Sequence, residues 1–118
     1  MKSISASIKK AVIEMMLLNL LNQQDMYGYE LTQTLKHQSN GRFTILEGSM
    51  YPILYRLTEE HHISSYEKKV GKRQVRVYYH IEKSGMELLQ NMKDEYEDYI
   101  QLINELLSIK ISDEGSKN

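Results

Sequence analysis

The chain has 118 residues, one proline and no cysteine, and its 15 basic and 16 acidic side chains leave a net charge of −1. This length suits one compact domain with one additional element. The lack of cysteine excludes disulfides, cysteine-ligated zinc and cysteine nucleophiles, and it fits a cytoplasmic protein. A nearly neutral chain gives no overall electrostatic reason to expect a nucleic-acid partner.

Apolar residues at helical spacing predict a first helix over residues 8–22. This segment is apolar nearly all round, which indicates burial on more than one side, against the core and against a partner subunit. Its strongly apolar part, Val12 to Leu21, is interrupted by Glu14 and Asn19. It is shorter than the roughly 20 residues that span a bilayer, so we expect no membrane segment.

Two further helices are predicted before residue 62. The second covers residues 27–38 and is ended by Ser39-Asn40-Gly41, because Asn and Gly accept the left-handed conformation that follows a helix. The third runs from near Glu47 to about His61, with Pro52 limiting its start. Between them, residues 42–45 are β-prone and predict either a short strand or an extended connector.

Residues 63–70 and 75–81 predict two strands around a basic turn. Val75, Val77, Tyr79 and Ile81 alternate with polar or outward residues, as in a half-buried antiparallel strand. Residues 67–81 contain five basic side chains against one acidic side chain, whereas residues 82–118 contain four against nine. The neutral total therefore conceals a hairpin of charge +4, which is either a polyanion-binding surface or a solvated hairpin tip.

A long helix is predicted from residue 83 to about residue 110. A seam with alternating spacings of three and four predicts packing against another helix, for which the first helix of a second subunit is the best candidate. The predicted dimer interface is Val12, Met15, Met16, Leu89, Met92, Tyr96, Tyr99, Ile103 and Leu106.

The order of these elements is that of a winged helix-turn-helix with an appended dimerisation helix. Four groups of residues, 26–31, 47–57, 71–73 and 78–85, with Tyr27-Gly28-Tyr29, Tyr51-Pro52 and Tyr78-Tyr79 within them, resemble the PadR family of transcriptional regulators. In this chain, His80 stands where the family often has a basic residue, and Glu82 replaces the Thr that usually begins the last helix.

The resemblance implies a homodimeric repressor that binds double-stranded DNA at an inverted repeat. It also implies that many members of the family respond to small aromatic or cationic compounds, so a small planar aromatic ligand is an expected effector. It implies DNA contacts from Tyr29, Ser49, Tyr51, Arg56, Lys72 and Arg73. The helical count and the strand alternation add Tyr55 and Arg76, on outward faces. Two alternatives stay open, because Tyr51 suits packing as well as DNA, and Arg56 suits a surface ion pair with Glu59 or Glu60.

Tyr96 and Tyr99 are unusual in a dry helical seam, because each hydroxyl needs a partner. They are either dimer packing or, with Met15 and Met92, the lining of an effector pocket between subunits. A competing function is a winged-helix module that binds another protein without contacting DNA. No catalytic constellation, cofactor motif or metal-ligand spacing is visible, so neither an enzyme nor a cofactor is expected.

We therefore expect a mainly α fold with a small β-hairpin. Residues 1–81 would form the winged helix-turn-helix, residues 82–111 the dimerisation helix, and residues 112–118 a frayed polar tail.

Overall fold

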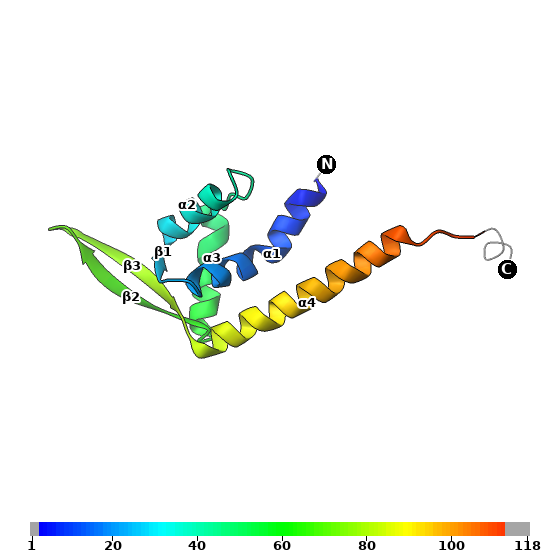
Figure 1. Cartoon of the computed structure of the whole chain (residues 1–118). Helices are drawn as coiled ribbons and strands as arrows, with labels where there is room; N and C mark the ends of the chain where they lie inside the picture. Colours follow the sequence, from blue (N-terminus) through cyan, green and yellow to red (C-terminus); the bar gives the residue numbers. More distant parts are fainter. Residues whose placement is uncertain (1–2, 113–118) are drawn as a thin grey trace.

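The computed structural model describes residues 3–112, which form four helices and a small sheet (Figure 1). Their order is α1 (Ile4–Leu21), β1 (Met26–Tyr27), α2 (Gly28–Gln38), α3 (Glu47–Glu59), β2 (Ile63–Val70), β3 (Gln74–Ile81) and α4 (Lys83–Ser108). The predicted winged-helix order with a long final helix is thus confirmed. The frayed tail predicted for residues 112–118 lies outside the described residues, apart from Ser112.

Helix α1 begins four residues earlier than predicted. Ser3 caps it, because its hydroxyl accepts a hydrogen bond from the Ala6 backbone N–H at 3.2 Å. The second half of α1, from Met15 onward, supplies much of the core, whereas Ile4 and Ile8 in the first half are 78% and 49% exposed. The sequence predicted that this helix is buried on several sides. Within the single chain, that prediction holds only for the second half of α1.

Both middle helices end in the same hydrogen-bonded motif. After α2, Asn40 and Gly41 have positive φ, and the Gly41 N–H donates to the Lys36 carbonyl at 2.8 Å. After α3, His61 has φ 62°, and the His62 N–H donates to the Leu57 carbonyl at 2.9 Å. These bonds satisfy carbonyls that a helix end leaves unpaired, and they end α3 at Glu59, before the predicted His61.

The strand β1 was not predicted from the sequence. Met26 and Tyr27 pair antiparallel with Tyr79 and Tyr78 of β3, which gives a three-stranded sheet of order β1-β3-β2. A two-residue strand is too short to show alternation, and its partner lies about fifty residues later in the chain. Residues 42–45 form a connector and not a strand, in which Ile45 is buried in the core.

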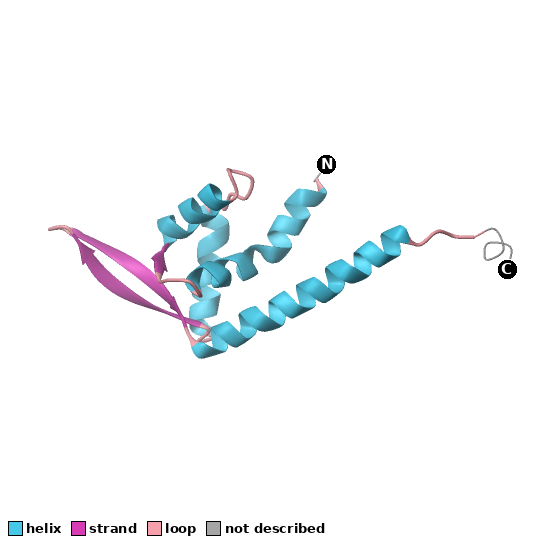
Figure 2. Ribbon diagram, in the orientation of Figure 1, coloured by secondary structure: helices cyan, strands magenta, loops and turns pink. Residues whose placement is uncertain are grey.

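The hairpin of β2 and β3 projects away from the helices (Figure 2). Tyr79 and Ile81 are buried as predicted, but Val75 and Val77 are 49% and 43% exposed. The predicted half-buried strand is therefore wrong for its outer half, because the helices cover only the root of the hairpin. We call this hairpin, residues 63–81, the wing.

Helix α4 starts at a tightly packed joint between the end of α3 and the end of β3. The Glu82 N–H donates to the His62 carbonyl at 2.9 Å, and the Ser84 hydroxyl donates to the His61 carbonyl at 3.0 Å. A Cβ on Gly85 would overlap the His62 carbonyl oxygen, so only glycine allows this approach. The Glu82 side chain does not cap α4 and instead accepts a hydrogen bond from Ser64 at 2.7 Å.

Candidate nucleic-acid interface and adjoining groove

Tyr51 packs α3 against the start of α2. Its ring is half-buried against Gly28, where a Cβ would overlap the Tyr51 hydroxyl and ring edge. Burial, followed by the nearby Glu47 carboxylate and Tyr55, raises the pKa of Tyr51. The packing alternative for Tyr51 is therefore present in the structure, and a DNA contact from its partly exposed edge stays a prediction.

Three other predicted contact residues of α2 and α3 are exposed. Tyr29 in the first turn of α2 is 55% exposed, and Tyr55 on α3 is 61% exposed. The Tyr55 ring lies 6.0 Å from that of Tyr51, and Ser49 is exposed in the first turn of α3. Tyr29, Tyr55 and Ser49 thus present hydroxyls that are available to phosphates or base edges.

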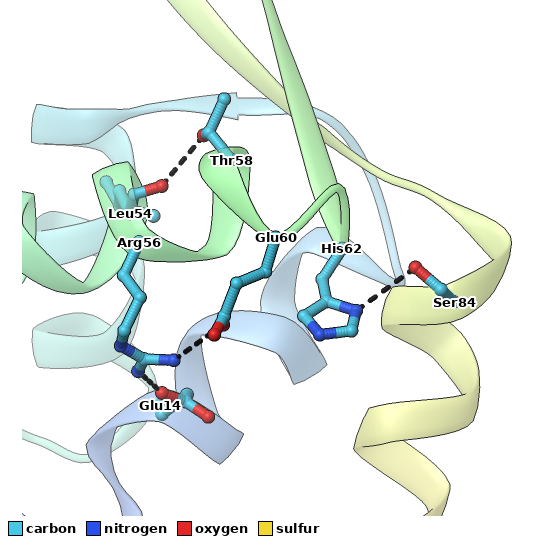
Figure 3. Close-up of polar contacts among 7 residues, drawn as sticks. All are labelled: Glu14, Leu54, Arg56, Thr58, Glu60, His62 and Ser84. Atoms are coloured by element: carbon cyan, nitrogen blue, oxygen red, sulfur yellow. Dashed lines mark hydrogen bonds and ion pairs between the residues drawn. The ribbon is translucent and has the colours of Figure 1, made fainter.

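Arg56 is engaged by two carboxylates and does not stand free on the outer face of α3. Its guanidinium forms ion pairs with Glu14 of α1 and with Glu60, the latter at 3.0 Å (Figure 3). The helical count placed Arg56 outward because it could not show that α1 runs past this side of α3. The ion pair that the sequence left open is present, with Glu14 added and without Glu59.

The basic side chains of the wing fall into two sets. Lys72 and Arg73 are exposed at the tip, and neither forms an ion pair within residues 3–112. Arg76 and Lys68 instead lie over tyrosine rings. The Arg76 guanidinium is 4.3 Å from the centre of the Tyr27 ring, and the Lys68 ammonium is 5.3 Å from that of Tyr78. Each cation–π contact holds the basic side chain against the face of a ring.

A polar cluster at the root of the wing was not predicted from the sequence. Asp25, just before β1, accepts hydrogen bonds from His80 Nδ1 at 2.7 Å and from the Tyr66 hydroxyl at 2.8 Å. Partial burial by itself would raise the pKa of Asp25, because it disfavours the charged carboxylate. The hydrogen bonds from His80 and Tyr66 outweigh this effect, so the pKa of Asp25 is lowered. The hydrogen bond to Asp25 raises the pKa of Tyr66.

No sequence signal could have found this cluster, because its three members are 14 to 55 residues apart. The pairing of Met26 with Tyr79 brings Asp25 opposite His80, and the β2–β3 register brings Tyr66 onto the same face. Tyr66 stacks on Tyr78, with ring centres 5.7 Å apart. Tyr78 therefore packs across the two strands of the wing.

The residues predicted for a dimer interface differ in what remains exposed. Leu89 is only 3% exposed in the single chain, so its side chain has almost no area left for a partner, and its assignment to the seam is wrong. Met16, Val12 and Met92 are partly buried against the core. Tyr96, Tyr99, Ile103 and Leu106 are 36% to 60% exposed along α4.

A groove of about 600 Å³ lies between α1 and α4. All four residues predicted for an effector pocket contribute to it. Its lining is Ala11, Val12, Met15, Met92, Glu95, Tyr96, Tyr99 and Ile100. The groove is largely apolar, with tyrosine rings on one wall and a methionine on each helix, which suits a flat aromatic molecule or a packed helix.

Within residues 3–112, no helix is long and apolar enough to cross a membrane. In the same part of the chain, no group of three histidine, aspartate or glutamate side chains is placed to hold a metal ion.

The sequence is similar to that of known transcriptional regulators. A sequence model of the "Transcriptional regulator PadR-like family" matches residues 17–91. "Uncharacterized protein X" of Lysinibacillus sphaericus is 27% identical over 101 residues, which are 86% of this chain and 93% of that protein. "Transcriptional regulator YqjI" of Escherichia coli is 32% identical over 63 residues, which are 53% of this chain and 30% of YqjI.

Solved structures show the same fold. A PadR-like transcriptional regulator of Bacillus cereus is 33% identical with a TM-score of 0.74, over 88% of this chain and 99% of that one. A transcriptional regulator of Clostridium thermocellum is 25% identical with a TM-score of 0.79, over 93% and 100%. Bacillus subtilis PadR, solved in complex with operator DNA, is 25% identical with a TM-score of 0.63, over 69% of this chain and 46% of PadR.

Proposed function

The chain belongs to the PadR-like family of transcriptional regulators, and from this premise we propose that it is a cytoplasmic, homodimeric repressor that binds an inverted repeat in double-stranded DNA. The observation that supports this most directly is the wing. Its tip exposes Lys72 and Arg73, free of ion pairs within the described residues, beyond the helices. Such a tip can reach phosphates while α3 lies in the major groove.

In this proposal, α3 reads bases with polar groups and not with a cation. Its single basic residue, Arg56, is already paired with Glu14 and Glu60. Ser49 and Tyr55 offer hydroxyls from the exposed side of α3, and Tyr29 offers one from the first turn of α2. The wing must therefore supply much of the positive charge that binds phosphates, whereas the acidic α4 starts at the root of the wing and extends away from its tip (Figure 1).

The test is a mobility-shift titration with the DNA upstream of the protein's own gene, repeated between 50 and 200 mM salt. We expect Lys72→Ala/Arg73→Ala to weaken binding to all DNA sequences and to reduce the slope of log affinity against log salt by about 2, since each lost phosphate contact removes roughly 0.9. The matched control is Lys83→Ala/Lys93→Ala, which removes the same charge from α4 and should leave the slope unchanged. Full affinity and full slope in the wing variant would refute the assignment of the wing.

We further propose that the dimer forms where α1 and α4 leave apolar side chains exposed. Ile4 and Ile8 on α1, and Ile103 and Leu106 on α4, are exposed in the single chain. Burial of such a stripe by a second copy is strongly favoured by the hydrophobic effect. A small aromatic effector in the groove beside Tyr96 and Tyr99 would shift DNA binding only if it binds one arrangement of the subunits better than the other.

A further inference from the structure

The wing is attached to the helical body through a narrow root. Only Ile63, Tyr79 and Ile81 of the wing are buried, and all three lie at the end nearest the helices. The pairing with β1 adds just two residues on each strand. The direction in which the outer half of the wing projects therefore depends on a small number of contacts at this root.

Asp25 is placed to fix that direction because it holds both strands of the wing at once. One carboxylate oxygen accepts from His80 on β3 and the other accepts from Tyr66 on β2. Asp25 itself belongs to the segment that joins α1 to β1, so it ties the wing to the helical body. Hydrogen bonds to a carboxylate are stronger than neutral ones, which suits this role.

The constraint extends from Asp25 toward the tip through stacked side chains. Tyr66 stacks on Tyr78, and the Tyr27 ring meets Tyr78 edge-on at 5.4 Å. Arg76 lies over Tyr27, two residues before the Tyr78 row. From that row to the start of β3 at Gln74, next to the tip, is four residues, or about 13 Å. A small rotation at the root therefore displaces the tip by more than the tolerance of a hydrogen bond.

We propose that Asp25 is a positioning residue for DNA binding, which sets where the wing places Lys72 and Arg73 relative to α3. This inference rests on the proposed function. It assigns a role to an acidic side chain on a surface where negative charge would by itself oppose DNA. Removing that charge should strengthen binding if only Coulomb attraction mattered, whereas loss of the positioning contact should weaken it.

The experiment measures DNA affinity of the full-length protein by fluorescence anisotropy on the fragment that the wild type binds. Asp25→Ala is expected to weaken binding about tenfold, which is about 1.4 kcal/mol. Tyr66→Phe, which removes one of the two hydrogen bonds and keeps the ring, should give a smaller loss. The matched control is Glu67→Ala, which removes an acidic side chain from the opposite face of the same hairpin and should leave binding equal or tighter.

A double-mutant cycle separates positioning of the wing from a general loss of structure. In the Lys72→Ala/Arg73→Ala background, Asp25→Ala should cause no further loss, because the misplaced tip no longer contributes. A second tenfold loss in that background would overturn the proposal, as would wild-type affinity in Asp25→Ala. If circular dichroism shows that Asp25→Ala does not fold, the same double-mutant cycle is measured with Tyr66→Phe in its place and tests the proposal. If the wild type binds no DNA, the proposed function fails. If the wild type binds DNA and Asp25→Ala binds it equally well, only the role of Asp25 fails.

Discussion

At the scale of single residues, two glycines decide how the helices meet. Gly28 lets the Tyr51 ring lie across the first turn of α2, and Gly85 lets α4 start against the His62 carbonyl. The sequence places glycines at these positions but gives no sign of what approaches them. Arg56 shows the same limit, because its helical position is readable while its partner Glu14, 42 residues earlier, is not.

Gly28→Ala should therefore destabilise the protein. The added methyl group overlaps the Tyr51 hydroxyl and ring edge, so that Tyr51 must leave its position between α2 and α3. We expect a loss of about 1–3 kcal/mol in the free energy of unfolding, the usual range for overpacking. Urea denaturation followed by circular dichroism measures it.

Gly48→Ala is the matched control, because a Cβ there meets nothing within 4 Å in the described structure. Alanine is the better helix former, so this variant should be as stable as the wild type or up to about 1 kcal/mol more stable. The packing argument for Tyr51 would be refuted if both glycine variants had the stability of the wild type.

At the scale of elements, the hydrophobic period of a segment predicts whether it forms a helix or a strand. It predicts less well which other elements cover that helix or strand. The two-residue period of β3 is correct, yet Val75 and Val77 are exposed because no helix covers the outer wing. Helix α4 forms where its heptad spacing predicted a helix, but Leu89, the first residue of that seam, faces the core of its own chain. A groove between α1 and α4 of the same chain gathers Met15, Met92, Tyr96 and Tyr99, and the predicted pocket between subunits stays a prediction.

Tyr96→Ala tests whether this groove binds ligands. We expect the affinity for proflavine, a planar cationic dye, to fall about tenfold, because a stacked ring and its apolar contact are removed. Dye fluorescence during titration with the protein measures it. Tyr55→Ala makes the same change on α3, away from the groove, and should bind the dye like the wild type. A Tyr96→Ala protein with a weakened dimer and unaltered dye affinity would show that Tyr96 serves packing alone.

At the scale of the whole molecule, the described fold leaves its longest helix only partly covered. Helix α4 has 26 residues, or about 39 Å, and only Gly85 and Leu89 of it are buried. Beyond the contact with α1, exposed apolar side chains follow the helix to its end, among them Leu102, Ile103, Leu106 and Leu107. A surface of this kind, taken with the inverted-repeat operator proposed above, favours the proposed two-fold dimer.

Ile103→Asp should convert a dimer into a monomer without unfolding the chain. A carboxylate in an apolar interface would destabilise the dimer by at least about 2 kcal/mol. In the single chain Ile103 is 36% exposed, so the substitution should change the free energy of unfolding of the monomer by less than about 0.5 kcal/mol. Sedimentation velocity measures the mass, and thermal unfolding reports the fold. The control is Gln101→Asp on the opposite side of α4, and a wild type that sediments with the mass of one chain would contradict the dimer.

The sequence by itself determined the four helices and the two strands of the wing, the basic charge of that wing after a neutral first half, and the family resemblance that links these to DNA. These properties follow from periodicity, turn residues and local charge, which depend on neighbours in the chain. Only the tertiary structure decided that Arg56 is held by Glu14, that Leu89 belongs to the core, and that Asp25 joins Tyr66 to His80. Each of these depends on residues far apart in sequence, which come together only through the register of the sheet and the packing of the helices.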